Sequence, residues 1–72
     1  MNKRLLESKM KIFGDTNVTL AQAIGISPQR LSAKKNGTNN ADFNRLEIDK
    51  IKQRYSLTIE EINSIFFAWL VS

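Results

Sequence analysis

The chain has 72 residues, a length near the lower limit for a stable hydrophobic core, so one helix-rich domain is expected over residues 1 to 72. Cysteine, histidine and a glycine-rich phosphate loop are all missing, which excludes disulfides and ordinary zinc sites and predicts no enzyme, no cofactor and no small-molecule substrate. The net charge of +4 is concentrated in residues 1 to 37, which hold seven Lys and Arg against two acidic residues. This distribution favours a nucleic-acid partner. The alternative is that the lysines only make a helical surface soluble.

The first predicted helix covers residues 2 to 13. Its apolar side chains recur at helical spacing, Gly14 follows as a stop signal, and Thr16 is expected to cap the next helix. The apolar stripe consists of Leu6, Met10 and Phe13, widened by Leu5 and Ile12. We expect this stripe to cover the core formed by the next two helices.

Residues 16 to 37 predict two short helices joined by a tight turn, a helix-turn-helix. Gly25 ends the first of these helices, at a point where the backbone needs a positive φ. Ser27 caps the second helix, Pro28 occupies its first position, and Gly37 follows its end. The apolar side chains expected to hold the two helices at a fixed angle are Leu20, Ala21, Ile24, Ile26 and Leu31.

The amino end of the second helix of this pair carries side chains suited to reading DNA. Gln29 and Arg30 are expected to face away from the apolar core, and such side chains pair with adenine and guanine by two hydrogen bonds each. The other positions assigned to DNA are Ser32, for bases, and Lys34, Lys35 and Asn36, for phosphates or for the helix dipole. A plain solvated helix face is the alternative.

A polar, turn-prone loop over residues 38 to 42 leads to a fourth predicted helix. Asn44 and Glu47 form a capping box at its start, and Phe43 is expected to anchor the entry. The apolar side of this helix consists of Leu46, Ile48, Ile51 and Tyr55.

The fifth predicted helix begins near Ile59, after a capping residue at Thr58, and runs to about residue 70. At about 100° per residue, its core stripe consists of Ile59, Ile62, Ile65, Phe66, Trp69 and Leu70. Phe67 and Val71 fall outside this stripe, on the same side as Glu60, so these three residues are assigned to a partner-binding surface. For Glu60, favourable charge at a helix amino end is the simpler alternative.

The predicted helix-turn-helix resembles that of the Cro/CI (XRE) family of regulators found in temperate phages and bacteria. The matching residues, at the family's spacing, are Ala21, Gly25, Ile26, Leu31, Asn36 and Gly37. The resemblance covers most of the chain and implies an all-α fold, a compact five-helix domain with a central helix-turn-helix. It also implies that Asn17 contacts phosphate and that Gln29, Arg30 and Ser32 read bases. Lys34 stands where the family usually has an inward-facing apolar residue, and a lysine stem can snorkel past a small core.

The same resemblance implies a small Cro-like regulator or antirepressor of a phage lysis-lysogeny switch. Such a protein counteracts a CI-type repressor by forming a complex with it, by binding operator DNA, or by both. A stand-alone dimeric, sequence-specific transcriptional repressor is the alternative, and a toxin- or antitoxin-like partner of an enzyme is a third hypothesis that the missing catalytic side chains disfavour. The expected partners are double-stranded operator DNA, a CI-type repressor and a second copy of the chain in a homodimer.

Neither a targeting segment nor a membrane segment is predicted. The residues at the amino end lack the apolar run of a signal peptide, and the longest uncharged stretch, residues 62 to 72, is too short to span a bilayer. We therefore expect a protein that is cytoplasmic in the bacterial host cell and makes no membrane contact.

Overall fold

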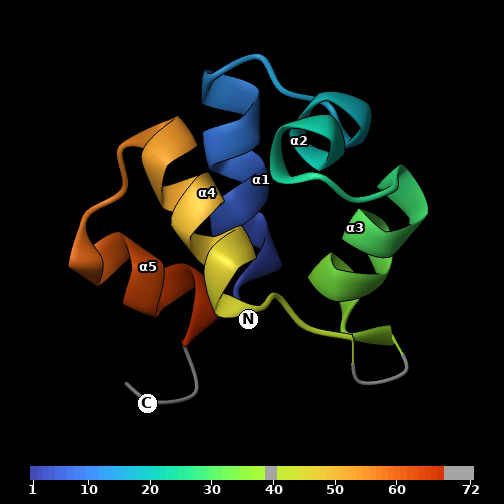
Figure 1. Ribbon diagram of the computed structural model, residues 1–72. Helices are drawn as coiled ribbons and strands as arrows, with labels where there is room; N and C mark the ends of the chain where they lie inside the picture. The colour runs from blue at the N-terminus through green and yellow to red at the C-terminus, as the bar shows by residue number, and fades with distance from the viewer. Residues whose placement is uncertain (39–40, 68–72) are drawn as a thin grey trace.

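The computed structural model describes residues 1–38 and 41–67, and within these residues it is all-α, with five helices and no strand (Figure 1). In chain order the helices are α1 (Lys3–Ile12), α2 (Asn17–Ile24), α3 (Pro28–Asn36), α4 (Arg45–Tyr55) and α5 (Ile59–Phe66). The first three agree with the predicted boundaries to within a residue or two, and α4 begins where its capping box predicts. Among the described residues, no helix has both the length and the apolar character needed to cross a membrane.

The helices surround one hydrophobic core. Figure 1 shows α1 and α4 at the centre, with α2 and α3 on one side and α5 on the other. The α2 helix packs against α3 and α4, and α5 packs against α1 and α4. All five helices contribute to the core, which consists of Leu6, Met10, Leu20, Ala21, Ile24, Leu31, Phe43, Ile51, Tyr55, Leu57, Ile65 and Phe66.

Helix starts in this chain are fixed by short polar side chains, as predicted. Thr16, Ser27, Asn44 and Thr58 each accept a hydrogen bond from the backbone N–H three residues later, at 3.3, 3.2, 2.8 and 3.1 Å. These bonds satisfy N–H groups that have no partner inside the helix. Each helix therefore begins where its own sequence requires.

Asp15, in the connection between α1 and α2, joins that connection to the end of α4. Two nitrogens of Arg54, Nε and Nη2, donate to its two carboxylate oxygens at 2.7 and 2.6 Å, and the Tyr55 hydroxyl donates at 2.6 Å. The Thr19 hydroxyl donates a fourth bond at 2.9 Å. The bonds from Arg54, more than any other contact, hold the pKa of the Asp15 carboxyl well below its ordinary value. Phe13 covers the ring of Tyr55, with the two centroids 5.0 Å apart.

Five apolar residues that the helical stripes placed in the core are exposed instead. These are Leu5, Ile12, Phe13, Leu46 and Ile59, which are 40%, 73%, 51%, 63% and 72% exposed. All five lie in the first or last turn of a helix or directly after it. The stripe argument assumes a neighbouring helix along the whole length, and this assumption fails at helix ends.

The last helix is shorter than predicted, and this changes the position of Phe67. Helix α5 ends at Phe66, and Phe67 adopts φ −123° and ψ 34°, which is not helical. A projection at about 100° per residue does not apply beyond the helix end. Phe67 is half-buried and packs against the core, so its assignment to an exposed partner-binding surface is corrected. Trp69, Leu70 and Val71 lie outside the described residues.

Candidate nucleic-acid interface

Helices α2 and α3 are joined by a turn of three residues, Gly25 to Ser27. Gly25 has φ 81° and donates its N–H to the Gln22 carbonyl oxygen at 3.3 Å, while the Ile26 N–H bonds to the Ala21 carbonyl oxygen at 2.9 Å. A Cβ on Gly25 would meet only the Lys50 ammonium, at 3.9 Å. The need for glycine is therefore conformational and does not come from lack of space.

Gln29 and Arg30 lie in the first turn of α3 and are exposed, as predicted. Pro28 and the Ser27 cap fix the direction in which this turn begins. No side-chain hydrogen bond or ion pair of Gln29 or Arg30 is found among residues 1–38 and 41–67. Both side chains are therefore available to a ligand that approaches the amino end of α3.

Lys34 points into the protein and does not reach the surface by snorkelling. Its ammonium donates to Glu47 Oε1 at 2.6 Å, and both side chains are only 8% exposed. Burial tends to raise the pKa of the Glu47 carboxyl, but the hydrogen bonds from Lys34 and from the Asn44 N–H outweigh it, so this pKa lies below its ordinary value. The assignment of Lys34 to phosphate is corrected, because its charge is used inside the domain.

Lys35 is buried as well, at the junction of three helices. Its side chain is 4% exposed, and its ammonium donates to Asn17 Oδ1 at 2.7 Å and lies 3.3 Å from Glu7 Oε2. The Asn17 amide nitrogen in turn donates to Ser32 Oγ at 3.2 Å. Lys35 is therefore corrected from a phosphate contact to an internal one. Asn17 and Ser32, predicted to face DNA separately, are only half-exposed and contact each other.

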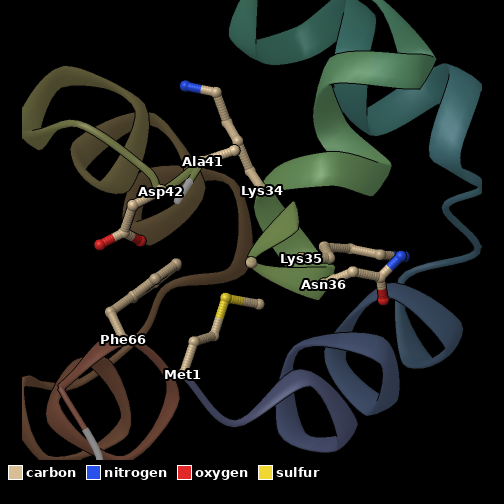
Figure 2. Close-up of a pocket in the computed structure, with 8 residues that line it drawn as sticks. Met1, Lys34, Lys35, Asn36, Ala41, Asp42 and Phe66 are labelled. Atoms are coloured by element: carbon tan, nitrogen blue, oxygen red, sulfur yellow. The ribbon is translucent and has the colours of Figure 1, made fainter. Parts of the chain in front are cut away.

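Asn36 ends α3 and remains exposed, with its Oδ1 accepting a hydrogen bond from the Lys3 ammonium at 2.6 Å. Beside it lies an open cavity of about 360 Å³ lined in part by Met1, Lys34 and Phe66. Figure 2 shows Met1 and Phe66 on one side of this cavity and the Lys34 side chain extending away from them. Neither lysine of α3 offers a free charge to this cavity, because both are paired elsewhere.

The inward direction of the two lysines follows from their spacing. Lys34 and Lys35 lie three and four residues after Leu31, which is fully buried, and positions at this spacing share one face of a helix. Their acidic partners, Glu47 and Glu7, lie 13 and 28 residues away in the sequence. Sequence reasoning gave Glu47 only a capping role and gave Glu7 none. The Leu31 spacing was the available signal for the direction of the lysines, but no local signal identifies their partners.

Comparison of the chain with family models, curated proteins and solved structures finds no match. The candidate interface therefore rests on the residues themselves. Of the seven positions assigned to DNA, Gln29 and Arg30 are fully available, Asn36 is exposed, Asn17 and Ser32 form one half-exposed pair, and the two lysines are internal.

Proposed function

We propose that this chain is a DNA-binding regulator of the helix-turn-helix type, similar to the Cro/CI family, in which α3 enters the major groove. The observation that carries the proposal is the α2–turn–α3 unit with Gln29 and Arg30 exposed on the first turn of α3. In this class of motif, the amino-terminal residues of the second helix contact base edges. Glutamine and arginine are also the side chains that pair with adenine and guanine by two hydrogen bonds.

The contact set supported by the structure is small, and this bears on how operator DNA would be bound. With Lys34 and Lys35 used internally, base contacts fall to Gln29 and Arg30, and Asn17 with Ser32 supplies neutral donors. A single module of this kind buries only about 600–1,000 Å² on DNA, so paired half-sites are needed for high affinity. The proposed DNA-binding form is therefore a homodimer or a complex with a second regulator, in the cytoplasm of a bacterial host.

Selection of duplexes from a random-sequence library, followed by footprinting, tests this proposal. A double Gln29→Ala and Arg30→Ala variant should lose base preference, and Arg30→Ala alone should cost about 1–3 kcal/mol of binding free energy. The matched control is Lys52→Ala with Gln53→Ala, which removes an exposed cation and an exposed amide from α4. Unchanged footprints for the Gln29 and Arg30 double variant would refute the assignment of α3 to the major groove.

A second function, capture of a CI-type repressor, is favoured by the amino end of α5. Ile59 is 72% exposed and lies beside the exposed Glu60 in the first turn of α5, which gives an apolar and acidic surface. Figure 1 shows α5 on the opposite side of the domain from α3. We propose this surface in place of the one built on Phe67. Ultracentrifugation with a purified CI-type repressor tests it. A complex that survives high salt and is lost in Ile59→Ser supports protein contact, since phosphate binding weakens steeply with salt.

A further inference from the structure

The buried Lys35 ammonium brings together α1, α2 and α3. It donates to Asn17 Oδ1 at 2.7 Å and lies 3.3 Å from Glu7 Oε2, while only 4% of the Lys35 side chain is exposed. An ammonium group is a donor only, and a buried one requires acceptors. Asn17 lies at the first position of α2, where backbone N–H groups also lack partners within the helix.

This contact determines which way the Asn17 carboxamide faces. Because Lys35 can only donate, it must face the amide oxygen, and the amide nitrogen is then directed to Ser32 Oγ, 3.2 Å away. The reversed amide would place an NH₂ group against an ammonium group. In the observed orientation, Asn17 uses one of its two N–H groups, and Ser32 accepts with its oxygen and keeps its own hydroxyl hydrogen. Two donors from two helices therefore lie next to each other.

We propose that Lys35 is a positioning residue for nucleic-acid binding: it holds the Asn17 amide so that Asn17 and Ser32 donate together to one backbone phosphate. This inference rests on the proposed function and deepens it, because it replaces a direct lysine–phosphate contact by a neutral donor pair. Phosphate contacts from amides, hydroxyls and helix amino ends are common in DNA complexes. Lys35 itself does not touch the phosphate, since its ammonium is buried between Glu7 and Asn17.

Salt dependence separates a positioning role from a direct one. A cation that contacts phosphate releases counterions, so its loss lowers the slope of log K against log salt by about 0.9, whereas a neutral donor contributes nothing to this slope. We expect Lys35→Met, which keeps the length of the stem, to weaken binding to a short mixed-sequence duplex about 2- to 10-fold, the range for one lost hydrogen bond. The slope should remain that of the parent. A slope that falls by the value for one cation overturns the proposal.

A double-mutant cycle tests whether Lys35 acts through Asn17. In an Asn17→Ala background, Lys35→Met should cause no further loss of affinity, because the group that it positions is already gone. Losses that multiply in the double variant overturn the proposal. Glu7→Gln is the matched control, since it removes a charge beside Lys35 and leaves the bond to Asn17 in place; its affinity should stay within about twofold of the parent.

Ser32→Ala keeps the proposal testable if Lys35→Met lowers the melting temperature too far. It removes the second donor without unpairing any charge, and we expect the same 2- to 10-fold loss with an unchanged slope, about the effect of one hydrogen bond. Parent-like affinity of Ser32→Ala overturns the donor pair. A parent chain that binds no duplex at low salt overturns the proposed function and this inference with it. A parent that binds, with Lys35→Met binding equally well, overturns the inference alone.

Discussion

Replacing Glu47 by Gln removes one charge from the buried Lys34–Glu47 pair and keeps the size of the side chain. Both side chains are 8% exposed, and Glu47 Oε1 also accepts the Asn44 N–H at 3.0 Å as part of the capping box. Glutamine can still accept that capping bond, so the variant isolates the charge. What remains is a buried Lys34 ammonium that faces a neutral amide instead of a carboxylate.

Removal of one partner from a buried ion pair costs about 3–5 kcal/mol, and the retained amide acceptor places Glu47→Gln near the lower end of that range. A chain of 72 residues has about 4–10 kcal/mol of stability in total. A loss of about 3 kcal/mol would lower the melting temperature by about 12–24 °C for a domain of this size. Glu47→Gln should therefore be folded at room temperature but close to its transition.

Urea denaturation followed by circular dichroism at neutral pH measures this loss. The Lys34→Met and Glu47→Gln double variant is the control, because it leaves no unpaired charge in the interior. Its loss in free energy of unfolding should be smaller than the sum of the losses of the two single variants, by a coupling energy of about 1–3 kcal/mol. The ion pair should also make the free energy of unfolding depend on pH. Because the pKa of Glu47 is lowered in the folded state, the stabilisation from this carboxylate is complete above the pKa of the unfolded carboxyl group. This stabilisation is lost as the pH falls from there through the lower pKa of the folded state. A Glu47→Gln variant that melts within about 2 °C of the parent, or single losses that add, would refute the reasoning.

Three further predictions concern the turn, the Asp15 network and the carboxyl end of α5. Gly25→Val should lower the free energy of unfolding by about 1–3 kcal/mol in thermal melting, because a β-branched residue is strained at φ 81°. Asp15→Asn should lower the free energy of unfolding by about 2–3 kcal/mol near neutral pH, as measured by urea denaturation. Because the pKa of Asp15 is depressed in the folded state, the parent loses this stabilisation in acid. The difference between the variant and the parent should therefore shrink as the pH falls below about 4. Phe67→Ser should lower the melting temperature by several degrees, an effect of about 1–2 kcal/mol, because Phe67 packs against the core. Ile59→Ser should leave the melting temperature unchanged, because Ile59 is exposed. A larger decrease for Ile59→Ser than for Phe67→Ser would contradict the placement of both residues.

Local signals in the sequence predicted the helix boundaries well. A cap such as Ser27, or a glycine such as Gly25, acts within three or four residues, so its effect can be read without knowledge of the rest of the chain. The exceptions are the carboxyl ends of α4 and α5. Helix α4 ends before Ser56, which adopts φ 51° without being glycine, and α5 ends at Phe66 instead of near residue 70. Nothing in the surrounding residues marked either end.

The candidate site was harder to predict because its lysines are paired with acidic residues that lie far from them in the sequence. The exposure of Gln29 and Arg30 follows from their place in the first turn of α3, and the sequence alone indicated it. The partners of the α3 lysines come from α1 and α4, and no periodicity within α3 reveals them. Phe67 was misplaced for a different reason: the predicted helix ran to about residue 70, whereas α5 ends at Phe66, so the helical projection does not apply to Phe67.

The two buried lysines of α3 also restrict how this sequence can diverge. A single replacement at position 34 or 47 leaves an unpaired buried charge, and about 3–5 kcal/mol is a large share of the stability of a 72-residue domain. Sequences that keep the fold should therefore change both positions together, to an apolar pair or to a pair of reversed sign. This restriction does not apply to Glu7, which lies beside Lys35 and is half-exposed. Water can solvate a side chain that replaces Glu7. Positions 34 and 47 are thus expected to covary, and position 7 to drift freely.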